Sequence, residues 1–233
     1  MKINSVVIVG GGTSGWMTAS VFAKCFKGDI NVTLVESPTI PKVGVGESTI
    51  IQFNEFLKLI GLEDGDWMKE CNATYKTSIK FTDFSWKGDD FQYPFGGSRA
   101  PQSIFGWAQL AAKYNLPKSS FAQFMNASSY LLAEENKLTD NKHKVLRNFN
   151  FKEDTAYHFD AELFSKYLKD NVCLPNNVIH IPDDIVGVNK DDCGYVSSIV
   201  GNEGEYYADL FIDCSGFNSI LLEKEMGSEF LSF

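Results

Sequence analysis

A glycine-dense turn near the start of the chain has the residue types and spacing that bind a dinucleotide pyrophosphate. Gly10, Gly12 and Gly15 fit the pattern G-x-G-x-x-G. The first glycine allows a tight turn, the second lets backbone approach the phosphates, and the third permits close helix–strand packing. A helix after such a turn directs its N-terminal amides and its dipole at the phosphates. The alternative is a plain glycine turn without a ligand.

The elements around this turn favour the bound dinucleotide. The apolar run Val6 to Val9 predicts a buried parallel strand, and the run Trp16 to Phe26 is compatible with a helix. A second strand, Val32 to Val35, ends at Glu36, where a carboxylate can bind a ribose hydroxyl. Strand, turn, helix, strand and acid therefore stand in the order that a dinucleotide-binding fold requires.

A second glycine motif follows between residues 43 and 49. Gly44 and Gly46 precede Glu47, and two glycines allow the backbone to approach a flat ring or a phosphate closely. The alternative is a flexible loop that leads into a helix over about 50–60, with Thr49 opening a capping box. That alternative explains Thr49 but not the two glycines.

A lysine on a predicted strand is a candidate for a different chemistry. The strand over 77–86 places Ile79, Phe81 and Asp83 on one face and Lys80 on the other. A desolvated lysine has a lowered pKa and can hydrogen-bond or carry an electrophile. The strand pattern alone favours the other interpretation, a solvated lysine on the polar face.

The remaining elements position these residues. Residues 87–103 are rich in Gly, Pro, Asp and aromatic residues and predict a surface loop or lid. Helical patterns cover about 104–114 and 119–135, and Asp160 has the position of an N-cap for a helix over 161–170. Short strands follow at 178–181, 185–189, 195–200 and 206–213.

This order of elements favours FAD over NAD. A βαβ start, a long insert, a small meander and a late strand that ends at Asp213 differ from the regular βα units of an NAD-binding domain. The ribityl chain of FAD runs past such a strand end, so the preference rests on analogy between folds. For Asp213 the alternative is an acid that closes the strand into a turn.

Composition limits the class of protein. The 233 residues can bury a sizeable core, and the net charge of −9 argues against nucleic acid or an anionic membrane as a partner. No segment is long enough to span a bilayer. Five cysteines without a C-x-x-C pair and three scattered histidines argue against a zinc site, another metal site or a disulfide framework, and they suit a cytoplasmic location.

Five motifs follow one another along the chain, at Gly10–Trp16, Gly44–Thr49, Ile79–Phe81, Tyr157–Ala161 and Phe211–Phe217. Together they resemble the flavin-dependent halogenases of the tryptophan halogenase type. Their order and spacing match from near the first residue to the end, over roughly the N-terminal half of a family member. The resemblance implies an α/β fold with an FAD-binding Rossmann-like sheet of the glutathione-reductase type, a β-meander and a largely helical insert.

The resemblance also implies a reaction. In that family reduced FAD, oxygen and a halide give hypohalous acid, which travels to an indole or another electron-rich aromatic substrate. Lys80 matches the lysine that guides the electrophilic halogen. Tyr93 and Phe95 lie where the family presents aromatic residues around the substrate, although Tyr93 replaces a histidine. A separate flavin reductase would supply FADH2, a homodimer is a possible assembly, and no partner is a nucleic acid or a membrane.

A larger set of residues is expected to bind FAD. Glu36 would meet the adenosine ribose, and Val186 matches a segment whose backbone contacts adenine in relatives. The full set is Gly10, Gly12, Thr13, Ser14, Gly15, Trp16, Glu36, Val45, Gly46, Glu47, Ser48, Val186, Asp213 and Gly216.

The sequence is also expected to be incomplete. Residues 1–82 and 150–217 would form a discontinuous FAD-binding domain, 83–149 an insert on the substrate side, and 218–233 the start of a missing C-terminal region. The family's G-W-x-W-x-I-P motif, the acidic partner of the lysine, the halide site and much of the substrate pocket are not in this sequence. Three functions stay open: a halogenase or its N-terminal portion, a monooxygenase-like enzyme, and a non-catalytic flavin-binding module.

Overall fold

A computed structural model describes most of the chain, which divides into two compact units. The described residues are 2–41, 46–96, 104–117, 120–139, 142–144, 146 and 149–231. The first unit comprises Met1–Gly46, Lys58–Asn72 and Phe159–Phe233, and the second comprises Glu47–Leu57 and Ala73–His158.

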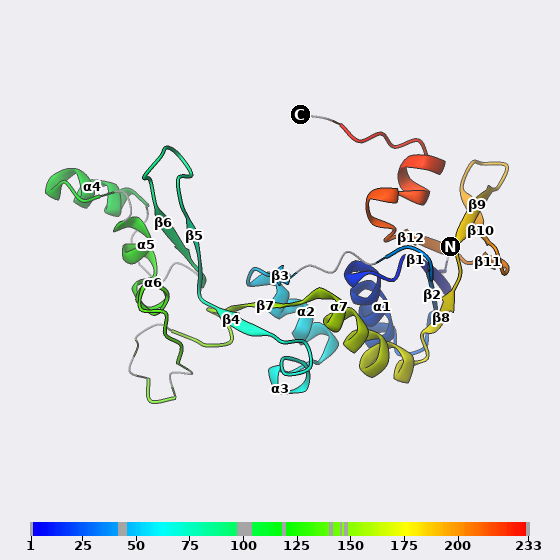
Figure 1. The fold of residues 1–233 in the computed structure, drawn as a ribbon, viewed down its shortest axis with the longest axis horizontal. Coiled ribbons are helices and arrows are strands. Elements are labelled where there is room, and N and C mark those ends of the chain that lie inside the picture. Colours follow the sequence, from blue (N-terminus) through cyan, green and yellow to red (C-terminus); the bar gives the residue numbers. More distant parts are fainter. Residues whose placement is uncertain are drawn as a thin grey trace. The chain divides into compact units, whose positions relative to one another are not determined.

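The first unit is built on a four-stranded parallel sheet with the order β12-β1-β2-β8 (Figure 1). Val9 at the end of β1 lies opposite Val35 on one side and Asp213 on the other. The apolar runs therefore form the central parallel strands that the sequence predicts. The bounds are β1 Ser5–Val9, β2 Asn31–Glu36, β8 Ile179–Pro182 and β12 Leu210–Asp213.

Helices cover one face of this sheet. Helix α1, Thr13–Phe26, follows β1, and helix α7, Ala161–Tyr167, continues into a π-helical turn, η1, over Leu168–Cys173. The carboxylate of Asp160 accepts hydrogen bonds from the amides of Glu162 and Leu163, both at 3.0 Å. The predicted N-cap at Asp160 is thus confirmed.

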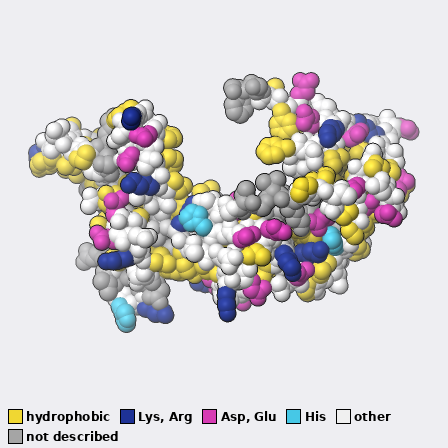
Figure 2. All heavy atoms as spheres, viewed as in Figure 1, with side chains coloured by type: hydrophobic (Ala, Val, Ile, Leu, Met, Phe, Trp, Pro, Cys, Tyr) yellow, Lys and Arg dark blue, Asp and Glu magenta, His cyan; other side chains and the backbone are white. Residues whose placement is uncertain are grey.

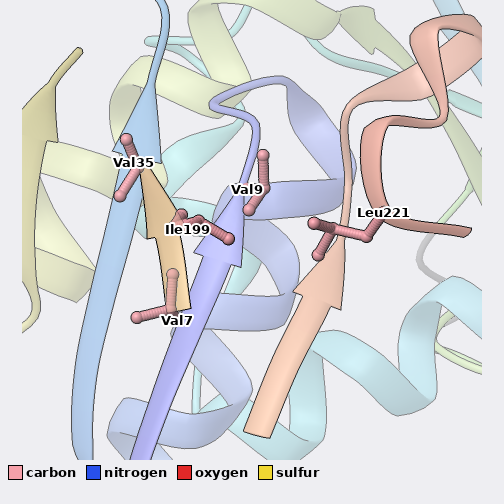
Figure 3. Packing of buried hydrophobic residues seen from close by; sticks show 5 residues of the cluster. All are labelled: Val7, Val9, Val35, Ile199 and Leu221. Atoms are coloured by element: carbon pink, nitrogen blue, oxygen red, sulfur yellow. The ribbon is translucent and has the colours of Figure 1, made fainter. Parts of the chain in front are cut away.

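A three-stranded meander covers the other face. It comprises β9 Ile185–Lys190, β10 Val196–Gly201 and β11 Glu205–Tyr207, in the order β11-β10-β9. Ile199 of β10 packs into a cluster with residues from β1, β2 and the segment after β12, as Figure 3 shows. Alternate residues of β1 reach this cluster, as the period of a strand requires. Its members are Val7, Val9, Val35, Ile199 and Leu221.

The remaining elements of the first unit are short. Trp67 in α3 is fully buried, with its ring 5.5 Å from Phe159 and 5.1 Å from Phe164. These elements are α3 Asp64–Trp67, η2 Leu174–Asn176, η3 Gly216–Asn218 and the π-helical η4 Ile220–Glu225.

The second unit holds most of two small sheets and several helices, and the ends of β3, α2 and β7 belong to the first unit. A three-stranded sheet has the order β3-β7-β4, and β5 pairs with β6 as an antiparallel hairpin. The bounds are β3 Gly46–Ser48, α2 Gln52–Ile60, β4 Thr74–Lys76, β5 Ser78–Phe81, β6 Phe91–Pro94, α4 Ile104–Tyr114, α5 Ser120–Met125, α6 Ala127–Glu134 and β7 Ala156–Asp160.

Exposed hydrophobic side chains gather over α4, as Figure 2 shows at the left of the view. Phe105 is 73% exposed and Tyr114 is 60% exposed.

None of the helices in the described part of the chain is long and apolar enough to cross a membrane.

Three local predictions are wrong in detail. Residues 87–103 are not all loop, because Phe91–Pro94 forms β6. The helical stretch 119–135 is interrupted at Asn126, whose side chain caps α6. Thr49 does not cap α2, which begins at Gln52. Its hydroxyl instead accepts from the amide of Tyr157 and donates to the carbonyl of Tyr157.

Candidate functional site

The glycine turn between β1 and α1 is shaped by packing at two positions and open at a third. Gly10 has φ +113°, and a Cβ there would lie 2.2 Å from the carbonyl oxygen of Cys214. A Cβ at Gly15 would lie 1.9 Å from the carbonyl oxygen of Gly10. At Gly12 a Cβ would meet no protein atom within 4 Å. Of these three glycines, only Gly12 has open space where a side chain would stand.

The N-terminus of α1 fits a phosphate. No side chain caps the helix at Gly12, and no acidic residue stands in its first turn. The hydroxyl of Thr13 accepts a hydrogen bond from Ser165 at 3.1 Å and donates to the carbonyl of Ala161 at 3.4 Å, so its side chain ties α1 to α7. Uncapped helix amides and the helix dipole favour an anion, and the residues present fit a dinucleotide pyrophosphate.

Glu36 ends β2 beside the glycine turn, as the sequence predicts. A Cβ at Gly11 would lie 2.2 Å from the carboxyl carbon of Glu36, so this carboxyl group packs directly on the turn. One carboxylate oxygen, Oε2, lies 2.8 Å from Nε2 of His180. His180 on β8 was not expected at the site, because only the pairing of β8 with β2 brings it there.

Trp16 and the Cys214 thiol belong to the packing around this turn. The Trp16 indole is fully buried, 5.3 Å from the His180 ring between centroids, and Lys169 lies over its ring. A contact of Trp16 with a cofactor would therefore use its backbone. Burial raises the pKa of Cys214, which is typical of a packed thiol and not of a reactive one.

Asp213 is held by protein donors on both carboxylate oxygens. Ser215 donates through its hydroxyl at 2.6 Å and its amide at 3.0 Å, and the amides of Leu221 and Leu222 donate at 2.8 and 2.9 Å. Burial alone would raise the pKa of Asp213, but these hydrogen bonds outweigh it and lower the pKa. This geometry suits an acid that closes β12 into the following turn.

The other residues expected to bind cofactor belong to other elements than the glycine turn. Val186 on β9 is 64% exposed. Gly216 has φ +63° and opens η3. Glu47 and Ser48 lie on β3, while Val45 and Gly44 lie outside the described residues.

Lys80 and Tyr93 project from opposite faces of the β5–β6 hairpin. Lys80 is exposed and lies opposite Gln92, whereas Tyr93 lies opposite Ile79. Directly opposite residues share a face in an antiparallel pair. The hydrogen bond from Ser78 Oγ to Gln92 Oε1, 2.7 Å, marks the face of Lys80. The strand places Lys80 as the sequence predicts, with Ile79 and Phe81 on the other face. The predicted strand over 77–86 is too long, because β5 ends at Phe81 and leaves Asp83 outside it.

The two aromatic residues expected around a substrate, Tyr93 and Phe95, differ in exposure. Phe95 is only 2% exposed, and the Nζ of Lys76 lies 5.1 Å from its ring centroid. Tyr93 is 59% exposed. A cavity of about 190 Å³ lies at the hairpin, smaller than the roughly 300 Å³ at which ligand pockets begin. Its lining residues are Ser85, Trp86, Asp89, Phe91, Gln92, Phe121 and Ala122.

Lys76 is a buried lysine that the sequence analysis missed. It is 8% exposed, and its Nζ donates to Ser48 Oγ at 2.6 Å. Burial lowers the pKa of Lys76, and burial together with the Lys76 charge lowers the pKa of His158.

All five cysteines are free thiols, and the described residues contain no cluster of His, Cys, Asp and Glu that could hold a metal ion.

Comparisons with known proteins agree on one family. The family model described as tryptophan halogenase matches residues 5–233. The tryptophan 6-halogenase SttH of Streptomyces toxytricini is 35% identical over 99% of this chain and 47% of its own length. The tryptophan 7-halogenase RebH of Lentzea aerocolonigenes is 33% identical over 99% of this chain and 46% of its own length.

Solved structures extend the likeness to the fold. A structure titled VirX1 apo is 47% identical with a TM-score of 0.91, and it covers 100% of this chain and 46% of its own. BrvH, a flavin-dependent halogenase from Brevundimonas sp. BAL3, is 32% identical with a TM-score of 0.81, covering 100% of this chain and 46% of its own. The chain thus spans about half the length of these relatives.

Proposed function

The chain belongs to the tryptophan halogenase family, and from this premise we propose that it carries the cofactor-binding half of a flavin-dependent halogenase. The observation that carries the proposal is the turn at Gly10, Gly12 and Gly15, where packing fixes two glycines and leaves the middle one open. The fold of the first unit places this turn at the carboxyl end of β1, where ligands bind in open α/β sheets.

The residues that would hold FAD follow from this arrangement. The backbone at Gly12 and the amides at the start of α1 would bind the pyrophosphate, and Glu36 would bind the adenosine ribose. The backbone of Val186 and of the segment Gly46–Ser48 would contact other parts of the cofactor. Reduced FAD, when bound, supplies two of the four electrons that reduce oxygen, and a halide supplies the other two as it becomes hypohalous acid.

Lys80 is proposed to guide the halogen. Its ammonium would donate a hydrogen bond from Nζ to the hypohalous acid and so make the halogen a better electrophile. Its place on a paired strand limits the positions that its Nζ can reach. The substrate class proposed is an indole or another electron-rich aromatic, consistent with the names of the relatives SttH and RebH.

A glycine substitution tests the cofactor site. Gly12→Val should weaken FAD binding by about 10- to 100-fold, because the new side chain lies where the pyrophosphate would approach. The backbone at Gly12 has φ −75°, which valine adopts, so the fold should be retained. FAD quenching of protein fluorescence gives the dissociation constant. Equal binding by Gly12→Val and the parent chain would contradict the proposal.

Two further glycine variants serve as controls. A Cβ at Gly65 would also meet no protein atom within 4 Å, so Gly65→Val should leave FAD binding unchanged. Gly15→Ala should instead unfold or strongly destabilise the first unit, because its Cβ would overlap the Gly10 carbonyl. Loss of FAD binding in Gly12→Val with normal unfolding therefore separates cofactor contact from packing.

A product assay tests the reaction. The chain is supplied with FAD, a flavin reductase, bromide and an indole, and products are identified by mass spectrometry. A brominated indole supports halogenation, whereas a hydroxylated product supports monooxygenation and contradicts the proposal.

A separate flavin reductase, a homodimer and a cytoplasmic location are further parts of the proposal. The free thiols support the last of these.

A further inference from the structure

Lys76 crosses a strand to reach its partner. In the sheet β3-β7-β4, Lys76 on β4 lies directly opposite Ala156 on the middle strand β7. Its Nζ nevertheless donates to Ser48 Oγ on β3, the third strand, at 2.6 Å. Two strand spacings amount to about 10 Å, a distance that an extended lysine and a serine can bridge only over a small residue. Ala156, fully buried, is that residue.

The ammonium group of Lys76 has few other contacts. No acidic side chain pairs with it in the described part of the chain, and besides Ser48 it contacts the ring of Phe95, whose centroid is 5.1 Å away. A charged donor in a buried position forms a stronger hydrogen bond than a neutral one. The lowered pKa of Lys76, caused by burial, agrees with a desolvated amine.

The two ends of this contact belong to segments with different proposed roles. Ser48 belongs to the second glycine motif, which is proposed to approach the cofactor. Lys76 is separated by one residue from β5, which carries Lys80. The carbonyl of Thr77, between the two strands, accepts from the amide of Phe95 at 2.8 Å and so holds this junction.

We propose that Lys76 is a positioning residue that fixes Ser48 and thereby ties the cofactor-side segment Glu47–Thr49 to the strands that carry Lys80. Thr49 is anchored independently, because its amide donates to the carbonyl of Tyr157 at 2.9 Å. Lys76 supplies the side-chain anchor of the preceding residue. The inference rests on the function proposed above, since only a bound flavin makes the position of this segment matter.

Hydrogen exchange on the full chain tests the contact without any cofactor. Lys76→Met keeps most of the apolar stem and removes the charge, and Ser48→Ala removes the acceptor. Each should raise amide exchange in peptides that cover residues 46–49 by about tenfold and leave β1 unchanged. The control Lys87→Met removes an exposed lysine of the hairpin loop and should change neither region.

Combining the two substitutions distinguishes a direct contact from general destabilisation. The double variant Lys76→Met with Ser48→Ala should exchange no faster at 46–49 than either single variant, because both remove one interaction. Unchanged exchange at 46–49 in the single variants, or additive effects in the double variant, would overturn the inference. If Lys76→Met fails to fold, exchange in Ser48→Ala alone decides, and unchanged exchange there overturns it.

FAD binding then tests the functional consequence. Lys76→Met and Ser48→Ala should each weaken FAD binding by about tenfold and alter the absorbance spectrum of bound flavin, while Lys87→Met should not. Equal FAD binding with faster exchange would overturn the link to the cofactor but leave the proposed function standing. If the parent chain binds no FAD, the proposed function fails, and the exchange data alone decide whether Lys76 fixes Ser48.

Discussion

The glycine turn of the first unit and the hairpin of the second unit hold their functional groups in different ways. In the turn the groups are backbone amides, held by contacts that leave no space for a Cβ at Gly10 or Gly15. On the hairpin the group is one side chain, Lys80, which is exposed on a two-stranded element. A backbone site is therefore specified almost completely by a short sequence, whereas a reactive side chain also needs surroundings that its own strand does not supply.

The largest expected effect separates the two regions directly. Lys80→Ala should lower the halogenation rate by roughly 1,000-fold, because the hydrogen bond to the electrophile is lost. FAD binding and the free energy of unfolding should not change, since Lys80 is exposed and lies outside the first unit. The rate is measured with reductase, bromide and an indole, and FAD binding by fluorescence.

Two results with Lys80→Ala would contradict this separation between the cofactor site and Lys80. If Lys80→Ala loses FAD affinity in proportion to its rate, the lysine contributes to the cofactor site and the two regions do not act separately. If Lys80→Ala keeps the parent rate, Lys80 has no role in the chemistry.

A second substitution tests whether Asp213, an acid beside the glycine turn, binds the cofactor. Asp213→Asn should lower the free energy of unfolding at pH 7 by about 2 kcal/mol, because four hydrogen bonds to a charged carboxylate are lost or weakened. FAD binding by the folded variant should change little. Urea unfolding gives the first quantity. A stable variant with weak FAD binding would assign Asp213 to the cofactor.

The same variant predicts a pH dependence. The pKa of Asp213 is lower in the folded chain than the value of about 3.9 in an unfolded one. Its contribution to stability is therefore present above about pH 3.9 and is lost as the pH falls through the folded pKa. The difference in unfolding free energy between the parent chain and Asp213→Asn should shrink as the pH falls below about 3.9. A constant difference would contradict the assignment.

The smallest effect tests the two faces of the hairpin. Tyr93→Ala should change the halogenation rate and the KM of the aromatic substrate by less than about twofold, because Tyr93 and Lys80 face opposite ways. Steady-state kinetics measure both values. A rise in KM of tenfold or more would place the substrate on the Tyr93 face.

Sequence reasoning succeeded where function depends on neighbours along the chain. The first strand, the helix after it and Glu36 lie where the glycine spacing requires, and Asp160 caps its helix. The alternation of side chains along a strand also placed Lys80 on the other face of the hairpin from Ile79 and Phe81. In these cases residues within a few positions of one another decide the outcome.

It failed where distant segments decide. Lys76 belongs to no motif of the sequence, and its contact with Ser48 depends on the pairing that places Ala156 opposite to it on β7. His180 reaches Glu36 only because β8 pairs with β2. Residues 91–94 contain a proline and follow a polar stretch, so only their pairing with β5 identifies them as a strand. None of these pairings leaves a local pattern.

The pairing of β1 with β12 has a consequence for the order of folding. Asn4 and Ser5 donate their amides to Asp209, 205 and 204 positions away, and Gly10 closes against Cys214. During synthesis β1 emerges about 200 residues before β12, its second neighbour in the sheet. Until then one edge of β1 is open to other chains, and such delayed, non-local pairing is slow. The strand that leads into the glycine turn is thus enclosed on both sides only after β12 has been made.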